Sequence, residues 1–271
     1  MSTRAADPAG DERTAPARRR GVSRWRWPLV SAVSAVGFVV VWAAVTSSGV
    51  VPSLFLPSPQ RVVTAGVELL GNGALLADIG ASMRRVLVGF VAAAVVGVPA
   101  GALLAQSRWA KAVFDPLLSL IRPLPSMAWI PLTLLWLGIT EAQKYTIVFM
   151  GTVAPLTLAM YAAASSIDPV LVKAARNLGA SKLAVLRLVV LPGSLPHILS
   201  GLRVMLGVSW TCVISAELVA ADKGLGFLIM NAREYFRTDQ VLVGMVLISM
   251  VVLATDLVLN LVERRLLRWR E

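Results

Sequence analysis

Side chains that could perform covalent chemistry are too few in this chain to build a catalytic centre. Its 271 residues include one cysteine, Cys212, and one histidine, His197. A catalytic triad or a Cys/His metal site needs several such groups. The nucleotide-binding pattern G-x-x-x-x-G-K-[ST] does not occur in the sequence. We therefore predict no enzymatic activity, and neither a metal nor a cofactor held by this chain.

The chemistry that remains is that of charges set in apolar sequence. Arg122 lies in "LIRPLPSMAWIPLTLLWLG", beside Pro123 and Pro125, and Glu217 lies in "VISAELVA". In a membrane, a charge or unwound backbone is tolerated only where it faces protein or water. A broken helix of this kind marks a transport path. The alternative for Arg122 is a cap whose side chain reaches the head groups.

From these features we select a set of candidate path or gate residues. For Glu217, a structural bond to Arg203 or an interfacial position is the alternative, and for methionine and tryptophan it is ordinary packing. The candidates are Arg122, Pro123, Pro125, Met127, Trp210, Glu217, Gly224 and Gly226.

The elements that must position these residues are membrane helices. Hydrophobic residues make up 57% of the chain and charged residues 15%, and the mean hydropathy is +0.74. A span needs about 20 mostly apolar residues. The sequence predicts an all-α polytopic protein with about six transmembrane helices, near residues 28–45, 86–106, 112–137 (interrupted), 145–164, 198–220 and 241–262.

Basic residues predict the orientation. If the N-terminus is cytoplasmic, the cytoplasmic segments hold 17 of the 26 Lys and Arg residues, and the outer segments hold 5. Positive charge concentrates on the cytoplasmic side of membrane proteins. We therefore expect both termini in the cytoplasm, and the net charge of +11 needs no nucleic acid to explain it.

A basic insert at 167–196 separates two spans on the expected cytoplasmic side. Asp168-Pro169 is a typical helix start, Gly179 a typical stop, and Ser181 a second cap. We expect two short helices around an elbow at Gly179, ended by Pro192 and Pro196. The insert could anchor the chain to the membrane surface or dock into a groove on another protein.

The insert "KAARNLGASKLAVLRLVVLP" resembles the EAA signature of ATP-binding-cassette (ABC) importer permeases. Ala174, Ala175, Gly179, Leu191 and Pro192 match that pattern, whereas Lys173 replaces the usual glutamate. In that family the insert couples to a cytoplasmic ATPase. The resemblance thus implies an ATPase-coupling set of Lys173, Ala174, Ala175, Gly179, Ala180, Ser181, Leu191 and Pro192, within a type I importer permease fold.

Other stretches resemble one branch of the family. "LPSPQRV", "RPLPSMAWIPLTLLWLGI" and "GLGFLIMNAREYFRTD" are similar to taurine, aliphatic-sulfonate and nitrate permeases, and "RWRWPL" and "GLRVMLGVSW" point most closely to the taurine permease. The resemblance implies import of taurine or another alkanesulfonate, with nitrate, pyrimidine precursors or other small solutes as alternatives. A stand-alone secondary transporter remains a rival, but it leaves the insert unexplained.

The same resemblance implies the partners: two cytoplasmic ATPase subunits that use ATP and Mg²⁺, a second copy of this chain, and a periplasmic or lipid-anchored solute-binding protein. We expect a disordered cytoplasmic tail at 1–27, a first transmembrane helix with an outer interfacial segment at 28–79, a permease core at 80–265, and a cytoplasmic tail at 266–271.

Overall fold

The computed structural model describes residues 26–121 and 123–268, so almost all of the predicted tail at 1–27, Arg122 and the last three residues lie outside the described part. Every regular element within it is helical, which confirms the predicted all-α class. The helices are α1 (Arg26–Ser47), α2 (Pro59–Gly71), α3 (Ala74–Gln106), α4 (Arg108–Ile121), η1 (Ser126–Trp129), α5 (Ile130–Leu137), α6 (Glu141–Ser165), α7 (Pro169–Asn177), α8 (Lys182–Val185), η2 (Leu186–Val190), α9 (Leu191–Ala220), α10 (Leu225–Glu234) and α11 (Thr238–Leu266).

Within the described residues, five helices are long and apolar enough to cross a membrane: α1, α3, α6, α11, and α9 together with its lead-in from Lys182. The pair formed by α4 and Ser126–Leu137 is sharply bent and makes a sixth candidate if it is one broken span. This agrees with the predicted six spans and the interrupted third. The second span begins at Ala74 rather than near Val86 because its first turns carry polar residues that hydropathy alone rejects.

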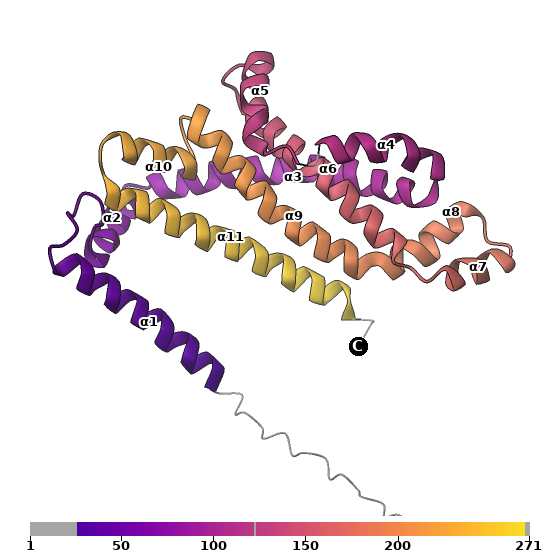
Figure 1. Ribbon diagram of the computed structural model, residues 1–271, viewed down its shortest axis with the longest axis horizontal. Coiled ribbons are helices and arrows are strands. Elements are labelled where there is room, and N and C mark those ends of the chain that lie inside the picture. The colour runs from indigo at the N-terminus through magenta and orange to yellow at the C-terminus, as the bar shows by residue number, and fades with distance from the viewer. Residues whose placement is uncertain (1–25, 122, 269–271) are drawn as a thin grey trace, which may run out of the picture.

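The centre of the fold is the packing of α3, α6 and α9 (Figure 1). Two glycines of α3 lie on the contact with α6. A Cβ on Gly101 would lie 2.5 Å from Cβ of Met160, and one on Gly97 would lie 3.3 Å from Leu156. Glycine at these positions therefore lets α3 and α6 approach closely, which a side chain would prevent.

The N-terminal helices are attached to the bundle by few contacts. α1 runs away from it in Figure 1 and has no buried residue in its 18-residue apolar window. Trp42 donates its indole N–H to the carbonyl of Pro57 at 3.1 Å and packs beside Val62 and Val243. The segment after the first span contains α2, which is capped by Ser58 and anchored to α11 through Val62.

The basic insert lies at the end of the bundle opposite α10 (Figure 1). Its first helix is α7, and its second continues through a π-helical turn, Leu186–Val190, directly into α9. The expectation that Pro192 and Pro196 end that helix is therefore wrong. In this continuous helix Pro192 has no free first turn, so its missing N–H leaves one carbonyl of the preceding turn without a helical donor. The wider turn before it accommodates the ring, and the ribbon bends without breaking.

Candidate functional site

Two sites at opposite ends of the bundle contain the candidate functional residues. The first is the elbow, defined as residues 168–190. A carboxylate oxygen of Asp168 accepts the backbone N–H of Val170 at 2.8 Å, and Pro169 follows as the first helical residue. This cap satisfies an N–H that the first turn of α7 would otherwise leave unpaired. The sequence-based start of the elbow is confirmed.

The turn of the elbow is a Schellman motif centred on Gly179. The N–H of Ala180 donates to the carbonyl of Ala175 at 3.1 Å, and the N–H of Gly179 donates to that of Arg176 at 2.9 Å. Gly179 has φ +84°, and a Cβ there would meet nothing within 4 Å. Glycine is needed for its left-handed backbone and not for space. Ser181 then caps α8 by accepting the N–H of Ala184 at 3.2 Å.

The elbow helix α7 has two different faces. Val170, Leu171 and Leu178 are exposed, with Leu178 at 89%, and Ala174 lies exposed on the same side. Lys173 and Arg176 instead line a cavity between α7, α8 and the ends of α3 and α6. The coupling candidates are thus divided: Lys173 belongs to the cavity side, and the alanines belong to the outer side and the turn.

The last two coupling candidates do not lie at the tip of the elbow. Leu191 and Pro192 begin α9, and Leu191 packs against the core cluster that contains Ala163 and Ile198. These two residues connect the elbow to the bundle. The resemblance therefore groups residues with different structural positions.

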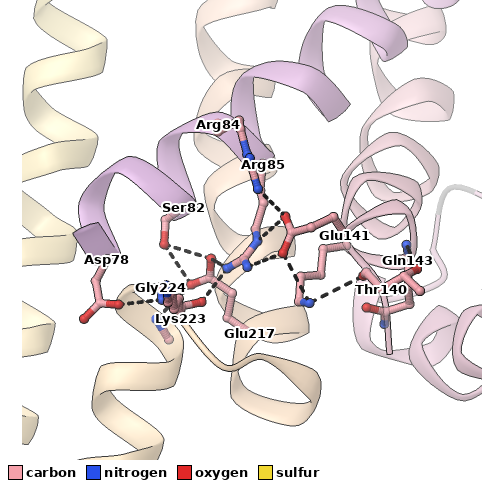
Figure 2. A network of polar contacts seen from close by, with 12 residues as sticks. Asp78, Ser82, Arg84, Arg85, Thr140, Glu141, Gln143, Glu217, Lys223 and Gly224 are labelled. Atoms are coloured by element: carbon pink, nitrogen blue, oxygen red, sulfur yellow. Dashed lines mark hydrogen bonds and ion pairs between the residues drawn. The ribbon is translucent and has the colours of Figure 1, made fainter. Parts of the chain in front are cut away.

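The second site is a buried polar cluster around Glu217, close to the C-terminus of α9 (Figure 2). The Glu217 side chain has an exposed fraction of 0%. Ser82 donates its hydroxyl to both carboxylate oxygens at 2.8 and 2.9 Å, and the N–H of Gly226 donates at 2.9 Å. Arg85 donates from Nη1 at 2.8 Å. A buried carboxylate needs this many partners to offset its lost hydration.

Arg85 joins three segments of the chain. Besides Glu217, its guanidinium donates to both carboxylate oxygens of Glu141, at the start of α6, and to the carbonyl of Lys223. Its side chain is 2% exposed, whereas that of its neighbour Arg84, which also bonds Glu141, is 60% exposed. The fork geometry of arginine suits two carboxylates at once. Arg85 therefore ties α3 to α6 and α9.

The loop before α10 closes over this cluster. The N–H of Gly224 donates to Asp78 at 2.8 Å, and the N–H of Leu225 donates to Ser82 at 2.9 Å. Cβ atoms on Gly224 and Gly226 would lie 2.5 and 2.7 Å from atoms of Glu217. Both glycines are therefore required for the backbone to approach the carboxylate. The structure brings together Glu217, Gly224 and Gly226 out of the predicted path or gate set.

The remaining path or gate candidates lie apart from this cluster. Trp210 is 2% exposed, packs in the main core, and donates its indole N–H to Thr255 at 3.2 Å. Pro123 and Pro125 lie between α4 and η1, where the third span breaks. Met127 is 55% exposed on η1.

Glu217 does not pair with Arg203, so that alternative is wrong. Arg203 instead binds Asp256 on α11, with Nη2 donating to Oδ2 at 2.5 Å. Residue order alone does not fix which of several arginines a buried acid meets. The missed partners of Glu217 on α3 are Ser82 and Arg85, and Asp78 belongs to the same cluster through the N–H of Gly224. The spacing of four and three residues places Asp78, Ser82 and Arg85 on one helix face.

Five or six candidate spans, with a capped helical elbow between two of them and only helices in the described part, define a polytopic membrane protein. Residues 97–268 match the family described as "Binding-protein-dependent transport system inner membrane component". The chain belongs to this family of ABC transport permeases. It is a multi-pass inner-membrane permease subunit and not an enzyme, and its family binds no cofactor itself.

Relatives along nearly the whole chain agree with this assignment. The taurine transport system permease protein of Escherichia coli is 37% identical over 91% of this chain and 93% of that protein. A putative aliphatic sulfonates transport permease of the same species is 37% identical over 92% and 94%. A bicarbonate transport system permease of Synechococcus elongatus is 30% identical over 96% and 98%.

The fold itself is similar to a solved importer. A chain of the MetNI methionine ABC transporter in an inward-facing conformation superposes with a TM-score of 0.63, covering 71% of this chain and 95% of that one at 21% identity. The predicted importer permease fold is confirmed by this match.

Proposed function

We propose that this chain forms the membrane pathway of an ATP-driven importer for a small organic anion, taurine or another alkanesulfonate. The observation that carries the proposal is the capped elbow, joined to a chain 37% identical to a taurine permease over 91% of its length. The family membership gives a stand-alone secondary transporter no support. Bicarbonate, nitrate and pyrimidine precursors are the competing solutes for the substrate test.

The elbow is the surface that we assign to a cytoplasmic ATPase subunit. Its outer face exposes Val170, Leu171 and Leu178 around the small side chain of Ala174. An apolar helix face with a small residue at its centre fits a groove on another protein. Ala175, Ala180 and Ser181 shape the turn, and Leu191 and Pro192 transmit its displacement to α9. This assignment places the elbow and both chain termini in the cytoplasm.

A second copy of the chain completes the pathway in this proposal. The described part of α4 buries no residue within one protomer and exposes Val113, Phe114, Leu117 and Leu120. Such a face needs lipid or another helix against it. Two copies related by a two-fold axis would place the break at Pro123 and Pro125, with Arg122 and Met127, beside the shared path. Trp210 would support that wall from inside the core.

The cluster of Glu217, Gly224 and Gly226 would then hold the outer end of each protomer closed around α3, α6 and α9. It lies at the end of the bundle opposite the elbow (Figure 1), where a solute-binding protein would deliver the substrate. We assign these residues a gate-supporting role, because Glu217 has no exposed surface that could contact a solute.

Transport assays test the substrate. The chain is reconstituted in proteoliposomes with its ATPase and the binding protein, and uptake of labelled taurine is measured with and without ATP. Unlabelled ethanesulfonate, nitrate and bicarbonate are added as competitors. We expect ATP-dependent uptake that sulfonates inhibit at the lowest concentrations. Stronger inhibition by nitrate or bicarbonate would refute the sulfonate assignment, and ATP-independent uptake would refute the importer mechanism.

A matched pair of glycines tests the elbow. Gly179 and Gly73 have φ of +84° and +69°, and a Cβ on either would meet nothing within 4 Å. Substitution by valine imposes a similar backbone strain at both positions. We expect Gly179→Val to lower ATPase association and uptake, while Gly73→Val, in the connection between α2 and α3, leaves the association unchanged. Normal association and uptake with Gly179→Val would contradict the docking assignment.

A further inference from the structure

The cavity behind the elbow has a consistent chemistry. It has a volume of about 400 Å³ and is lined by Lys173, Arg176 and Lys182, with Gln106 and Ser165 at the ends of α3 and α6. No acidic residue lines it. Among the described residues, the three cationic side chains have neither a hydrogen bond nor an ion pair. The cavity is therefore a cationic recess without an internal counter-ion.

The position of the cavity at the ends of two membrane spans indicates which kind of anion can reach it. Gln106 and Ser165 are the last residues of two membrane spans. With 25 residues, α6 is about 37 Å long, which exceeds a hydrocarbon core of about 30 Å. Its end thus reaches the head-group layer. The cavity floor, formed by Val185 and Val190, is apolar and buried, as a site for a head group with its first acyl carbons would be.

The basic side chains of α7 lie on a different face of the helix from the proposed docking surface. Lys173 and Arg176 lie on the cavity side of α7, whereas Val170, Leu171 and Leu178 are exposed elsewhere on the helix. A groove that takes the apolar face of α7 leaves the cavity side of the helix uncovered.

We propose that this cavity binds the phosphate of an anionic phospholipid, held by Lys173, Arg176 and Lys182. The bound lipid ties the elbow to the membrane surface at the level where α3 and α6 end. The binding itself does not depend on the transported solute. Its consequence for ATP-driven coupling rests on the proposed function. Lys173, which replaces the usual glutamate, acquires a role in this site.

Native mass spectrometry of the full chain in detergent tests the site, with phosphatidylglycerol and phosphatidylcholine as probes. We expect phosphatidylglycerol to be retained preferentially. Each basic residue near an anionic lipid contributes on the order of 1 kcal/mol, so Lys173→Gln with Lys182→Gln should weaken its binding roughly thirtyfold. Replacing both lysines by arginine should preserve binding, which separates loss of charge from loss of fold.

A charge-matched control uses Arg187→Gln with Arg264→Gln, since both arginines are exposed and outside the cavity. This control should keep its phosphatidylglycerol. Equal loss in both double variants would overturn the proposal, because binding would then follow net charge alone. Displacement of the lipid by equimolar glycerol phosphate or inorganic phosphate would also overturn it in favour of a soluble anion. ATPase association, measured on the same variants, shows separately whether the coupling proposal fails.

Discussion

Replacement of Arg85 by alanine should destabilise this protein more than an alanine substitution of any other charged residue in α3. The guanidinium is 2% exposed and bonds Glu217 and Glu141. Removing it leaves the fully buried carboxylate of Glu217 without its counter-ion. Breaking a buried pair in this way costs about 3–5 kcal/mol, which corresponds to a fall in Tm on the order of 10 °C for a chain of this size.

Arg84 provides the matched control. It is the adjacent residue, has the same side chain, and donates to the same Glu141 at 3.0 Å, but it is 60% exposed. An exposed pair contributes about 0–1 kcal/mol, so Arg84→Ala should lower Tm by at most a few degrees. Arg85→Lys, which keeps the charge and loses the fork, should fall between the two.

Thermal unfolding in detergent, followed by the fluorescence of the eight tryptophans, gives the comparison. A second readout is cross-linking between cysteines introduced in α3 and in the loop before α10, which reports whether the two segments stay together. Equal shifts for Arg84→Ala and Arg85→Ala would show that burial does not set the energy of this cluster. A neutral Arg85→Ala would refute the reasoning entirely.

Three further outcomes are expected from the packing. Gly101→Ala should lower Tm by forcing α3 from α6, whereas Gly80→Ala, on the same helix with nothing within 4 Å of its Cβ, should leave Tm unchanged or raise it slightly. Equal changes in Tm for the two variants would contradict the argument that glycine lets α3 and α6 approach closely. Gly224→Ala places a methyl 2.5 Å from the carboxylate beneath it and should expose the loop to limited proteolysis; an unchanged digestion pattern would contradict this. Arg203→Ala and Asp256→Ala should each reduce the amount of folded protein after detergent extraction. The double variant should recover it, since no unpaired charge remains in the span; a purely additive loss would deny the coupling.

The features that could be predicted from the sequence are those set by neighbouring residues. Asp168, Gly179 and Ser181 act within a few positions of themselves, so the caps and turn of the elbow follow from local rules. The spans follow from composition for the same reason. The continuation of the second elbow helix could not be predicted in this way, because a π-helical turn precedes Pro192 and lets the helix run on past it.

Partners that are distant in sequence could not be deduced. Arg85 and Glu217 are 132 residues apart, and hydropathy predicts the start of the second span after Arg85 because a charged residue lowers the mean hydropathy of any window that contains it. The spacing of Asp78, Ser82 and Arg85 was the available signal, but it becomes informative only once the helix is extended back to Ala74. Sequence specifies that a buried acid needs a cation. Packing decides which one.

The helix α9 connects the two ends of the molecule as one continuous helix. Its first turn adjoins the elbow, and Glu217 lies close to its last residue. With 30 residues, α9 is about 45 Å long. A tilt of about 5° around its midpoint would displace Glu217, about 17 Å from that midpoint, by roughly 1.5 Å, which exceeds the tolerance of a hydrogen bond. A small angular change of the helix at one membrane surface can therefore break the hydrogen bonds of Glu217 near the other surface. No residue between the two ends has to change its conformation.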